Sequence, residues 1–360
     1  MAKLFGRTYT REQLLARTGD ISQIAGVRMV QFAEGPEKGV AGAEFRTGSG
    51  LAFTVLPDRG LDVSAAEWRG RPLAWRSSTP EVHPHAYDPS GLGWLRSFCG
   101  GLVVTCGLTT CGSPSQDADE DLGLHGRASN LQAFDLGHGS YWDGDDYVMY
   151  IEGSLRETRI FGENLLLRRR ISAVMGEDRL FIDDLVTNEG PRTWPHAMLY
   201  HINTGFPVVD AGARLLAPSR KVAPRTDVAA KELDQHDRFI KPTRGYDERC
   251  YYHKLAADRA GKTLAAVANM RKGDAALGLY VRFSRRQLPW LIEWKMMGER
   301  DYVVGIEPAT NRVDGRAAER KAGRLIELEP AESRHYNLEV GVLAGARQVN
   351  ALRREVRAML

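Results

Sequence analysis

Residues 51–72 read Leu51-Ala-Phe-Thr-Val-Leu-Pro-Asp-Arg-Gly-Leu-Asp-Val-Ser-Ala-Ala-Glu-Trp-Arg-Gly-Arg-Pro72. Two short runs, 51–56 and 61–68, are separated by the turn Pro57-Asp-Arg-Gly60, and a second turn follows at Arg69-Gly70. Successive side chains of a strand point to opposite faces, so runs of this kind with turn residues between them predict a hairpin. The stretch therefore predicts consecutive antiparallel strands.

The same pattern of short strand-like runs separated by turn residues recurs along most of the chain. We expect further strands at 24–32, 41–47, 147–158, 165–174, 180–188, 264–269, 276–283, 291–296 and 336–343. The alternation of strands with helices that a parallel sheet needs is not visible. The sequence predicts an all-β protein, a large antiparallel β-sandwich with a few short helices, in which residues 1–360 form one domain.

Helix signals lie near the two ends of the chain. Thr10 is a predicted N-cap with Gln13 as its capping-box partner, and Gly19 lies beyond the expected end. The tail 346–360 places apolar residues on one helical face, and we expect it to pack on the body or on another subunit, which would allow a homodimer. Two irregular segments, 78–95 and 211–250, interrupt the pattern, and long ordered loops are often functional.

The composition excludes several classes of protein. The chain is 43% hydrophobic and 26% charged, with a net charge of +3, which is too small to predict a nucleic-acid or anionic-membrane partner. No apolar stretch is long enough for a membrane span and no signal peptide is visible, so we expect a cytoplasmic protein. The four cysteines show no C-x-x-C spacing, which indicates small buried thiols rather than a zinc knuckle.

Three separate segments carry residues able to move protons. The loop Gly123-Leu-His125-Gly-Arg127-Ala-Ser-Asn130 presents an imidazole and a guanidinium between glycines. The segment Met198-Leu-Tyr-His201-Ile-Asn203-Thr-Gly-Phe206 adds a second imidazole, and Val303-Val-Gly-Ile-Glu307-Pro308 adds a carboxylate. Two histidines and a carboxylate are a minimal set for acid–base chemistry on a neutral substrate.

Strand alternation divides these residues between faces. Ala197, Leu199, His201 and Asn203 should share one face, with His196, Met198 and Tyr200 on the other. His201 is then either a satisfied core histidine or part of a site, and the following Asn-x-Gly-Phe favours a site. Glu307 should stand beside the bare Gly305, and Pro308 should end the strand at an edge. Partial desolvation would raise the pKa of Glu307 toward that of a useful base, although a strand-end ion pair with an arginine is the alternative.

Other polar residues allow two interpretations. Glu293 and Lys295 share a face opposite Trp294, and they form either a surface ion pair or the polar floor of a cleft. Arg59 is either a structural, salt-bridging arginine or a ligand for a sugar hydroxyl, whereas Arg127 suits vicinal hydroxyls. His83 and His85 would need a third partner to bind a metal, and we assign no metal and no cofactor.

The chain resembles the aldose 1-epimerase, or galactose mutarotase-like, superfamily, and within it the branch called DUF4432. The motifs that carry the resemblance are Pro57-Asp-Arg-Gly-Leu-Asp62, Gly100-Gly-Leu-Val-Val-Thr-Cys-Gly-Leu108, Leu124-His-Gly-Arg127, Tyr200-His-Ile-Asn203 and Gly305-Ile-Glu-Pro308. The resemblance implies a β-supersandwich with a sugar site on a concave sheet face. No phosphate loop, dinucleotide fingerprint, nucleophile elbow or HExxH motif is present.

By the same resemblance, Glu307 is the expected general base, His201 the general acid and His125 a sugar-polarising residue. Arg127, Arg59, Asn203, Glu293 and Lys295 are the expected substrate-binding residues. The expected function is that of an isomerase, an aldose 1-epimerase acting on a hexose or a modified sugar in carbohydrate catabolism. The alternatives are a sugar isomerase or lyase, metal-assisted through His83, His85 or His125, and a non-catalytic carbohydrate-binding protein.

Overall fold

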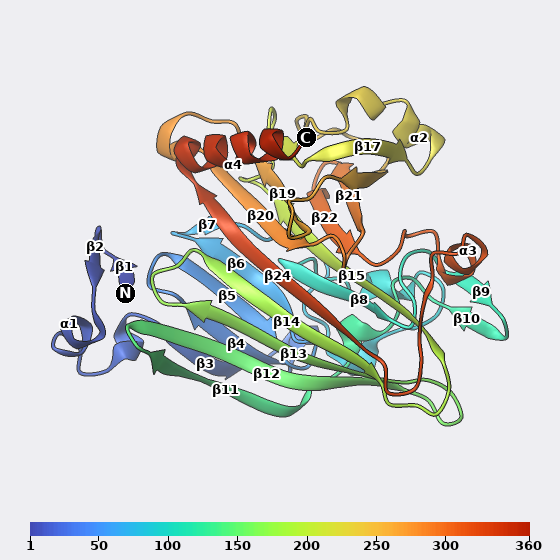
Figure 1. Ribbon diagram of the computed structural model, residues 1–360, viewed down its shortest axis with the longest axis horizontal. Coiled ribbons are helices and arrows are strands. Elements are labelled where there is room, and N and C mark those ends of the chain that lie inside the picture. Colours follow the sequence, from blue (N-terminus) through green and yellow to red (C-terminus); the bar gives the residue numbers. More distant parts are fainter.

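The computed structural model describes residues 1–360, and two large antiparallel sheets make up most of it (Figure 1). The first sheet has eight strands in the order β11 (Phe134–Asp143), β12 (Asp146–Thr158), β13 (Asn164–Val174), β14 (Arg179–Asn188), β24 (Ser333–Ala344), β20 (Leu277–Ser284), β19 (Lys262–Ala268) and β16 (Arg214–Leu216). Every neighbouring pair in it is antiparallel. The predicted strands 147–158, 165–174 and 180–188 form its long consecutive hairpins.

The second sheet has twelve strands and carries most of the candidate residues. Its main order is β17 (Ser219–Pro224), β18 (Arg249–Leu255), β21 (Trp290–Met297), β22 (Tyr302–Ala309), β15 (Trp194–Gly205), β8 (Val103–Leu108), β6 (Asp62–Trp68), β5 (Leu51–Leu56), β4 (Ala41–Arg46) and β3 (Gly26–Gln31). The short strands β7 (Arg71–Pro72) and β23 (Ile326–Leu328) pair with β6 and β15. The stretch 51–72 is the predicted hairpin, because β5 pairs antiparallel with β6.

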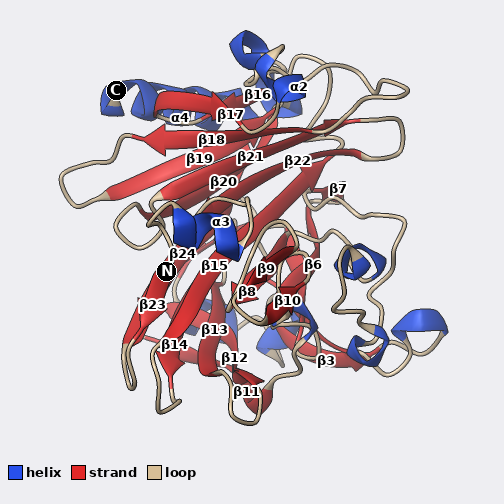
Figure 2. Ribbon diagram, turned by 90° about the vertical axis from the view of Figure 1, so that its right-hand side faces the viewer, coloured by secondary structure: helices blue, strands red, loops and turns tan.

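The helices are short and lie at the periphery of the sheets (Figure 2). They are α1 (Arg11–Leu15), α2 (Asp227–Ala230), α3 (Arg316–Lys321) and α4 (Gly345–Met359), and two small hairpins join β1 (Ala2–Leu4) to β2 (Arg7–Tyr9) and β9 (Ser115–Asp117) to β10 (Glu120–Leu122). The Thr10–Gln13 capping box of α1 is present as predicted. No helix combines the length and the apolar character that crossing a bilayer demands.

The C-terminal helix α4 packs on the body of its own chain. Val349, Leu352 and Val356 are buried against Leu264 of β19 and Leu343 of β24. This confirms the expectation that the tail packs on the body, and the homodimer stays a prediction.

The main core lies between the two sheets and comprises 57 buried residues, with Val63 and Ile202 from one sheet and Ile151 and Val186 from the other among them. The four cysteines are all buried and unpaired, as the spacing predicted. Apolar burial of this extent is the main force that holds the sheets together.

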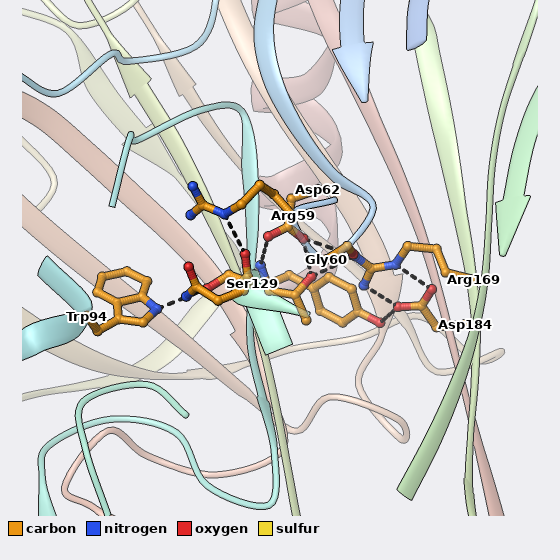
Figure 3. Close-up of polar contacts among 10 residues, drawn as sticks. Arg59, Gly60, Asp62, Trp94, Ser129, Arg169 and Asp184 are labelled. Carbon is orange, nitrogen blue, oxygen red and sulfur yellow. Dashed lines mark hydrogen bonds and ion pairs between the residues drawn. The ribbon is translucent and has the colours of Figure 1, made fainter. Parts of the chain in front are cut away.

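A buried polar network crosses the core beside β15 (Figure 3). Arg169 of β13 pairs with Asp184 of β14 at 2.6 Å and with Asp62 of β6 at 3.0 Å. Tyr200 of β15 donates its hydroxyl hydrogen to Asp184 at 2.6 Å. Buried charges are stable only when paired and hydrogen-bonded, so this network fixes how β15 sits against the opposite sheet.

The segment 211–250 is more regular than the sequence indicated. It contributes the edge strands β16 and β17 to the two sheets, followed by α2. Its short strands are only three and six residues long, and β17 includes two charged residues and a proline, so they lack the alternation that marks the other strands.

Candidate active site

Strand β15 lies between β22 and β8, and its two faces meet different surroundings. Tyr200 and Ile202 enter the core between the sheets, whereas Leu199 packs in a smaller cluster on the opposite face. His201 shares the face of Leu199 and lines a cavity of about 300 Å³. The predicted division of this strand is therefore confirmed.

The cavity is built on four strands that are neighbours in the sheet. It is lined by Cys250 of β18, Trp294 of β21, Glu307 of β22 and His201 of β15, and His125 reaches it from the loop after β10. The two imidazoles and the carboxylate singled out in the sequence thus come together from segments about 75 to 180 residues apart.

Glu307 and His201 face one another inside this cavity. Glu307 Oε1 lies 3.3 Å from His201 Nε2, yet it is buried without an aligned hydrogen-bond partner. Burial raises the pKa of Glu307 well above 4.5 and lowers the pKa of His201 to about 4. Desolvation penalises the charged form of each group, so burial disfavours the pair of a charged carboxylate and a charged imidazolium.

The space for the Glu307 carboxylate is provided by Gly305. A Cβ added to Gly305 would lie 2.4 Å from Glu307 Oε1 and 3.3 Å from His201 Cε1, so a side chain there would collide with the pair. The prediction that Pro308 ends an edge strand is wrong, because β22 is internal and continues to Ala309. Pro308 is accommodated since the pairing of β22 with β15 is interrupted between Ile306 and Ala309.

Asn203 determines which nitrogen of His201 carries the proton. The Asn203 amide nitrogen donates to the carbonyls of Gly101 (3.2 Å) and His201 (2.9 Å), which fixes the orientation of the amide. Its oxygen must then accept from His201 Nδ1–H at 2.5 Å. A neutral His201 consequently keeps its proton on Nδ1 and directs the free lone pair of Nε2 toward Glu307.

His125 is held in an unusual backbone conformation. Its φ angle is +59°, a left-handed value that is uncommon for residues other than glycine and is concentrated at functional sites. Its Nδ1 accepts from the Gly112 backbone N–H at 3.4 Å, which leaves the proton of the neutral ring on Nε2. Burial lowers the pKa of His125 well below 6.5, and the neighbouring His201 lowers it further. His125 is therefore a neutral hydrogen-bond donor.

Aromatic rings form the walls around the two histidines. The Trp94 ring lies 4.7 Å from that of His125, and Phe98 and Trp294 each lie 5.3 Å from His201, measured between ring centroids. Flat aromatic faces of this kind suit the apolar C–H face of a small ring compound.

Two charged residues of the cavity were not predicted from the sequence. Arg225 follows β17 and donates to Ser113 Oγ at 2.6 Å and to Asp314 at 3.3 Å. Glu248 precedes β18 and accepts from Trp294 Nε1 at 2.8 Å. Both belong to the segment 211–250, and their positions directly next to a strand end are the one signal that could have identified them.

Arg59 lies outside the cavity and binds backbone instead. It is buried, and its guanidinium donates to the carbonyls of Ser129 (2.9 Å), Val82 (2.7 Å) and Ser97 (2.7 Å). The Ser129 hydroxyl in turn accepts from Trp94 Nε1 at 3.0 Å (Figure 3). Of the two roles considered for Arg59, the geometry matches the structural one, since all three of its nitrogens donate to backbone carbonyls, although the expected salt bridge is absent.

Arg127 is exposed and does not reach the cavity with the two histidines. It lines a separate, polar cavity of about 180 Å³ together with Glu157 and Arg159. The loop turns sharply at Gly126, so side chains two residues apart leave it in different directions.

Glu293 and Lys295 are also remote from the cavity. They are buried on the opposite face of β21 from Trp294, and it is Trp294 that lines the cavity. The expectation of a polar cleft floor is corrected, because alternation shows which side chains share a face but not which face meets the cavity. The rings of His83 and His85 lie with their centroids 4.5 Å apart at an interplanar angle of 58°, and no third metal-ligating side chain joins them.

The fold is that of the galactose mutarotase-like proteins. The structure is similar to that of a "putative aldose 1-epimerase" from Klebsiella pneumoniae, with 28% sequence identity, a TM-score of 0.89, and coverage of 98% of this chain and 91% of the other. A family profile described as a domain of unknown function, DUF4432, matches residues 37–342. The chain belongs to the DUF4432 family.

More distant structures share the fold alone. The galactose 1-epimerase from Lactobacillus acidophilus has 14% identity and a TM-score of 0.57, with 89% of this chain and 99% of the other covered. A galactose mutarotase-like protein from Clostridium acetobutylicum has 15% identity and a TM-score of 0.59, with 88% and 99% covered. No curated protein matches the sequence.

Proposed function

We propose that the protein is an aldose 1-epimerase, an isomerase that interconverts the two anomers of a small sugar. The proposal rests on one observation: a buried carboxylate without a hydrogen-bond partner lies 3.3 Å from an imidazole nitrogen in a cavity with aromatic walls. The similarity to proteins named for this activity supports the choice of reaction. We also propose that residues 1–360 act as one domain, because a single core joins strands from both ends of the chain.

In the proposed reaction, Glu307 removes the proton from the O1 hydroxyl of the cyclic sugar. The C1–O1 bond becomes a carbonyl, the C1–O5 bond breaks, and O5 takes the proton from His201 Nε2. Rotation about C1–C2 presents the other face of the aldehyde. Ring closure then returns the O5 proton to His201 and the Glu307 proton to O1, so the enzyme and the proton count are restored.

The pair therefore holds one proton throughout and exchanges its position. In water an imidazole holds a proton more tightly than a carboxylate, which would favour the ion pair. Burial lowers the pKa of His201 and raises that of Glu307, which opposes the preference for the ion pair. A catalyst that must give and take a proton at both positions in each cycle benefits when the proton is not held at one position alone.

The remaining cavity residues have positioning roles in this proposal. Asn203 holds Nδ1–H of His201, so that Nε2 is the nitrogen that exchanges a proton. The His125 Nε2–H donates to a sugar oxygen, and Trp94 and Trp294 contact the ring. Arg225 and Glu248 line the cavity and can bind hydroxyl groups as donor and acceptor.

The decisive experiment compares Glu307→Gln with the parent protein. The amide keeps the shape of the carboxyl group but accepts no proton, so we expect anomer exchange to fall by about 10²–10⁴-fold, the usual contribution of one acid–base group. Freshly dissolved single anomers of several hexoses are followed by polarimetry and NMR. Glu299→Gln, at an exposed surface position, is the matched control.

A Glu307→Gln protein that is folded and exchanges anomers at the parental rate would refute the proposal. The same NMR experiment in deuterated water separates the alternatives. Deuterium incorporation at a carbon would indicate an isomerase or lyase, and sugar binding without turnover in the parent would indicate a binding protein.

A further inference from the structure

A second cluster of ionisable side chains lies on the other side of the strands that form the cavity. His253 of β18 and Glu293 of β21 point away from the cavity, because their neighbours Tyr252 and Trp294 occupy the cavity side. His236, just after a short 3-10 turn at 233–235, reaches them from the segment that covers this face.

The three side chains converge on a single point. Glu293 Oε2 lies 2.9 Å from His236 Nδ1 and 3.2 Å from His253 Nε2, and the three ligand atoms all lie within 4.8 Å of one another. We propose that His236, His253 and Glu293 form a binding site for a divalent first-row transition metal such as Zn²⁺. Two imidazole nitrogens and one carboxylate oxygen are a donor set that these ions accept, whereas Mg²⁺ and Ca²⁺ prefer oxygen alone.

Two buried atoms beside the cluster support this proposal. Glu293 Oε1 and the Tyr251 hydroxyl are both buried without a hydrogen-bond partner, and the Tyr251 ring lies 5.6 Å from that of His236. Hydrogen bonds within the cluster reach only one oxygen of Glu293, which leaves the other oxygen of a fully buried carboxylate unsatisfied. An unsatisfied buried polar atom is costly, and a bound cation would compensate the charge directly.

The surroundings are arranged as around a metal-binding histidine. Ser219 Oγ lies 2.8 Å from His253 Nδ1, so the ring nitrogen that faces away from Glu293 has the outer hydrogen bond that orients such ligands. Lys295 shares this face of β21 and attracts Glu293 through its charge, but its ammonium group donates to the Gln235 carbonyl at 3.0 Å and lies 3.8 Å from Glu232. It makes no direct ion pair with Glu293, so that carboxylate remains open to a bound cation.

Such a metal would fasten the covering segment to the sheet. His236 belongs to the segment between β17 and β18, whose two ends carry the cavity residues Arg225 and Glu248. Glu293 directly precedes Trp294 in the chain. The ion would therefore stabilise the wall of the cavity without contacting the sugar, and its binding can be measured independently of any enzymatic activity.

The experiment uses the full-length protein without a histidine tag, after treatment with a chelator. Zn²⁺ binding is measured by calorimetry, Co²⁺ binding by its visible absorption, and thermal stability with and without Zn²⁺. We expect one ion per chain and a rise in melting temperature. His236→Ala should bind Zn²⁺ at least tenfold more weakly and lose the rise, and because the His236 side chain is 19% exposed and lies in the covering segment rather than in a sheet, the change is compatible with folding.

The matched control is the double variant His83→Gln/His85→Gln, which removes an imidazole pair elsewhere on the molecule. It should bind Zn²⁺ like the parent. The proposal is overturned if the parent binds no stoichiometric Zn²⁺ or Co²⁺, if folded His236→Ala binds with the parental affinity, or if binding is lost in the double variant instead. Glu293→Gln, checked for folding by circular dichroism, should reproduce the His236→Ala result.

Discussion

Asn203→Ala is the change that best separates positioning from chemistry at the candidate active site. Alanine removes the acceptor for His201 Nδ1–H without touching Glu307. The ring of His201 is then free to move its proton to Nε2, the nitrogen that must exchange protons in the proposed reaction. We expect anomer exchange to fall by about 10²-fold or more, because a wrong histidine tautomer disables an acid–base group.

The cost in stability follows from the contacts that are lost. The Asn203 side chain makes three buried hydrogen bonds, with His201 Nδ1, the Gly101 carbonyl and the His201 carbonyl. At about 1 kcal/mol each, their loss lowers the free energy of unfolding by ~3 kcal/mol. With an unfolding entropy of about 2.1 cal/mol/K per residue, the melting temperature of a chain of 360 residues should fall by ~4 °C.

The assay combines polarimetry with ¹⁵N NMR of the histidine rings, which reports the tautomer directly. Asn269→Ala is the matched control, since Asn269 is equally buried and makes two hydrogen bonds, to Pro207 and from Leu277, away from the cavity. It should lose stability but keep activity. Folded Asn203→Ala that keeps the Nδ1–H tautomer, or exchanges anomers within about threefold of the parental rate, would refute the positioning role.

Three further predictions concern pH and the arginines. Burial lowers the pKa of His201 to about 4 and raises that of Glu307, and the active pair holds one proton. The catalysed rate, measured by polarimetry after subtraction of the spontaneous rate, should therefore fall as the pH drops through about 4. A fall in rate near pH 6.5 instead would contradict the lowered pKa of His201. Arg59→Met leaves three backbone carbonyls without their donor, so it should lower the free energy of unfolding, measured in urea, by ~3 kcal/mol. The KM should rise, because Ser129 no longer holds Trp94 firmly. An unchanged urea midpoint would argue against the structural role of Arg59. Arg127→Ala should change KM less than about twofold, since Arg127 lines the other cavity, and a tenfold rise would place it in contact with the sugar after all.

Local patterns in the sequence were sufficient for most of the fold. The long strands β12, β13 and β14 have an alternating or continuous apolar pattern, bounded by turn residues, and all three were predicted within a residue or two at each end. The strands β16 and β17 were missed because they are short, charged edge strands whose pairing depends on distant partners. Pairing of this kind is decided by tertiary contacts rather than by local preference.

The candidate site was predictable only in part, for a related reason. Spacing predicted that His201 and Asn203 share a face, and the structure places Glu307 and His125 beside them. For Glu293 and Lys295 the same alternation was correct, but nothing in it says which face of β21 meets the cavity. Arg225 and Glu248 reach the cavity because of the course taken by the long connection between β17 and β18, and no local sequence pattern predicts that course.

The distribution of the cavity residues along the chain has a consequence for biosynthesis. His125 and His201 leave the ribosome long before Glu307, and β22 must insert between β21 and β15 before the three groups meet. Contacts between such distant segments form slowly, since a long loop must be closed first. A nascent or truncated chain ending before β22 would therefore carry both imidazoles without the carboxylate proposed as the general base, and two separately expressed halves should become active only when they associate.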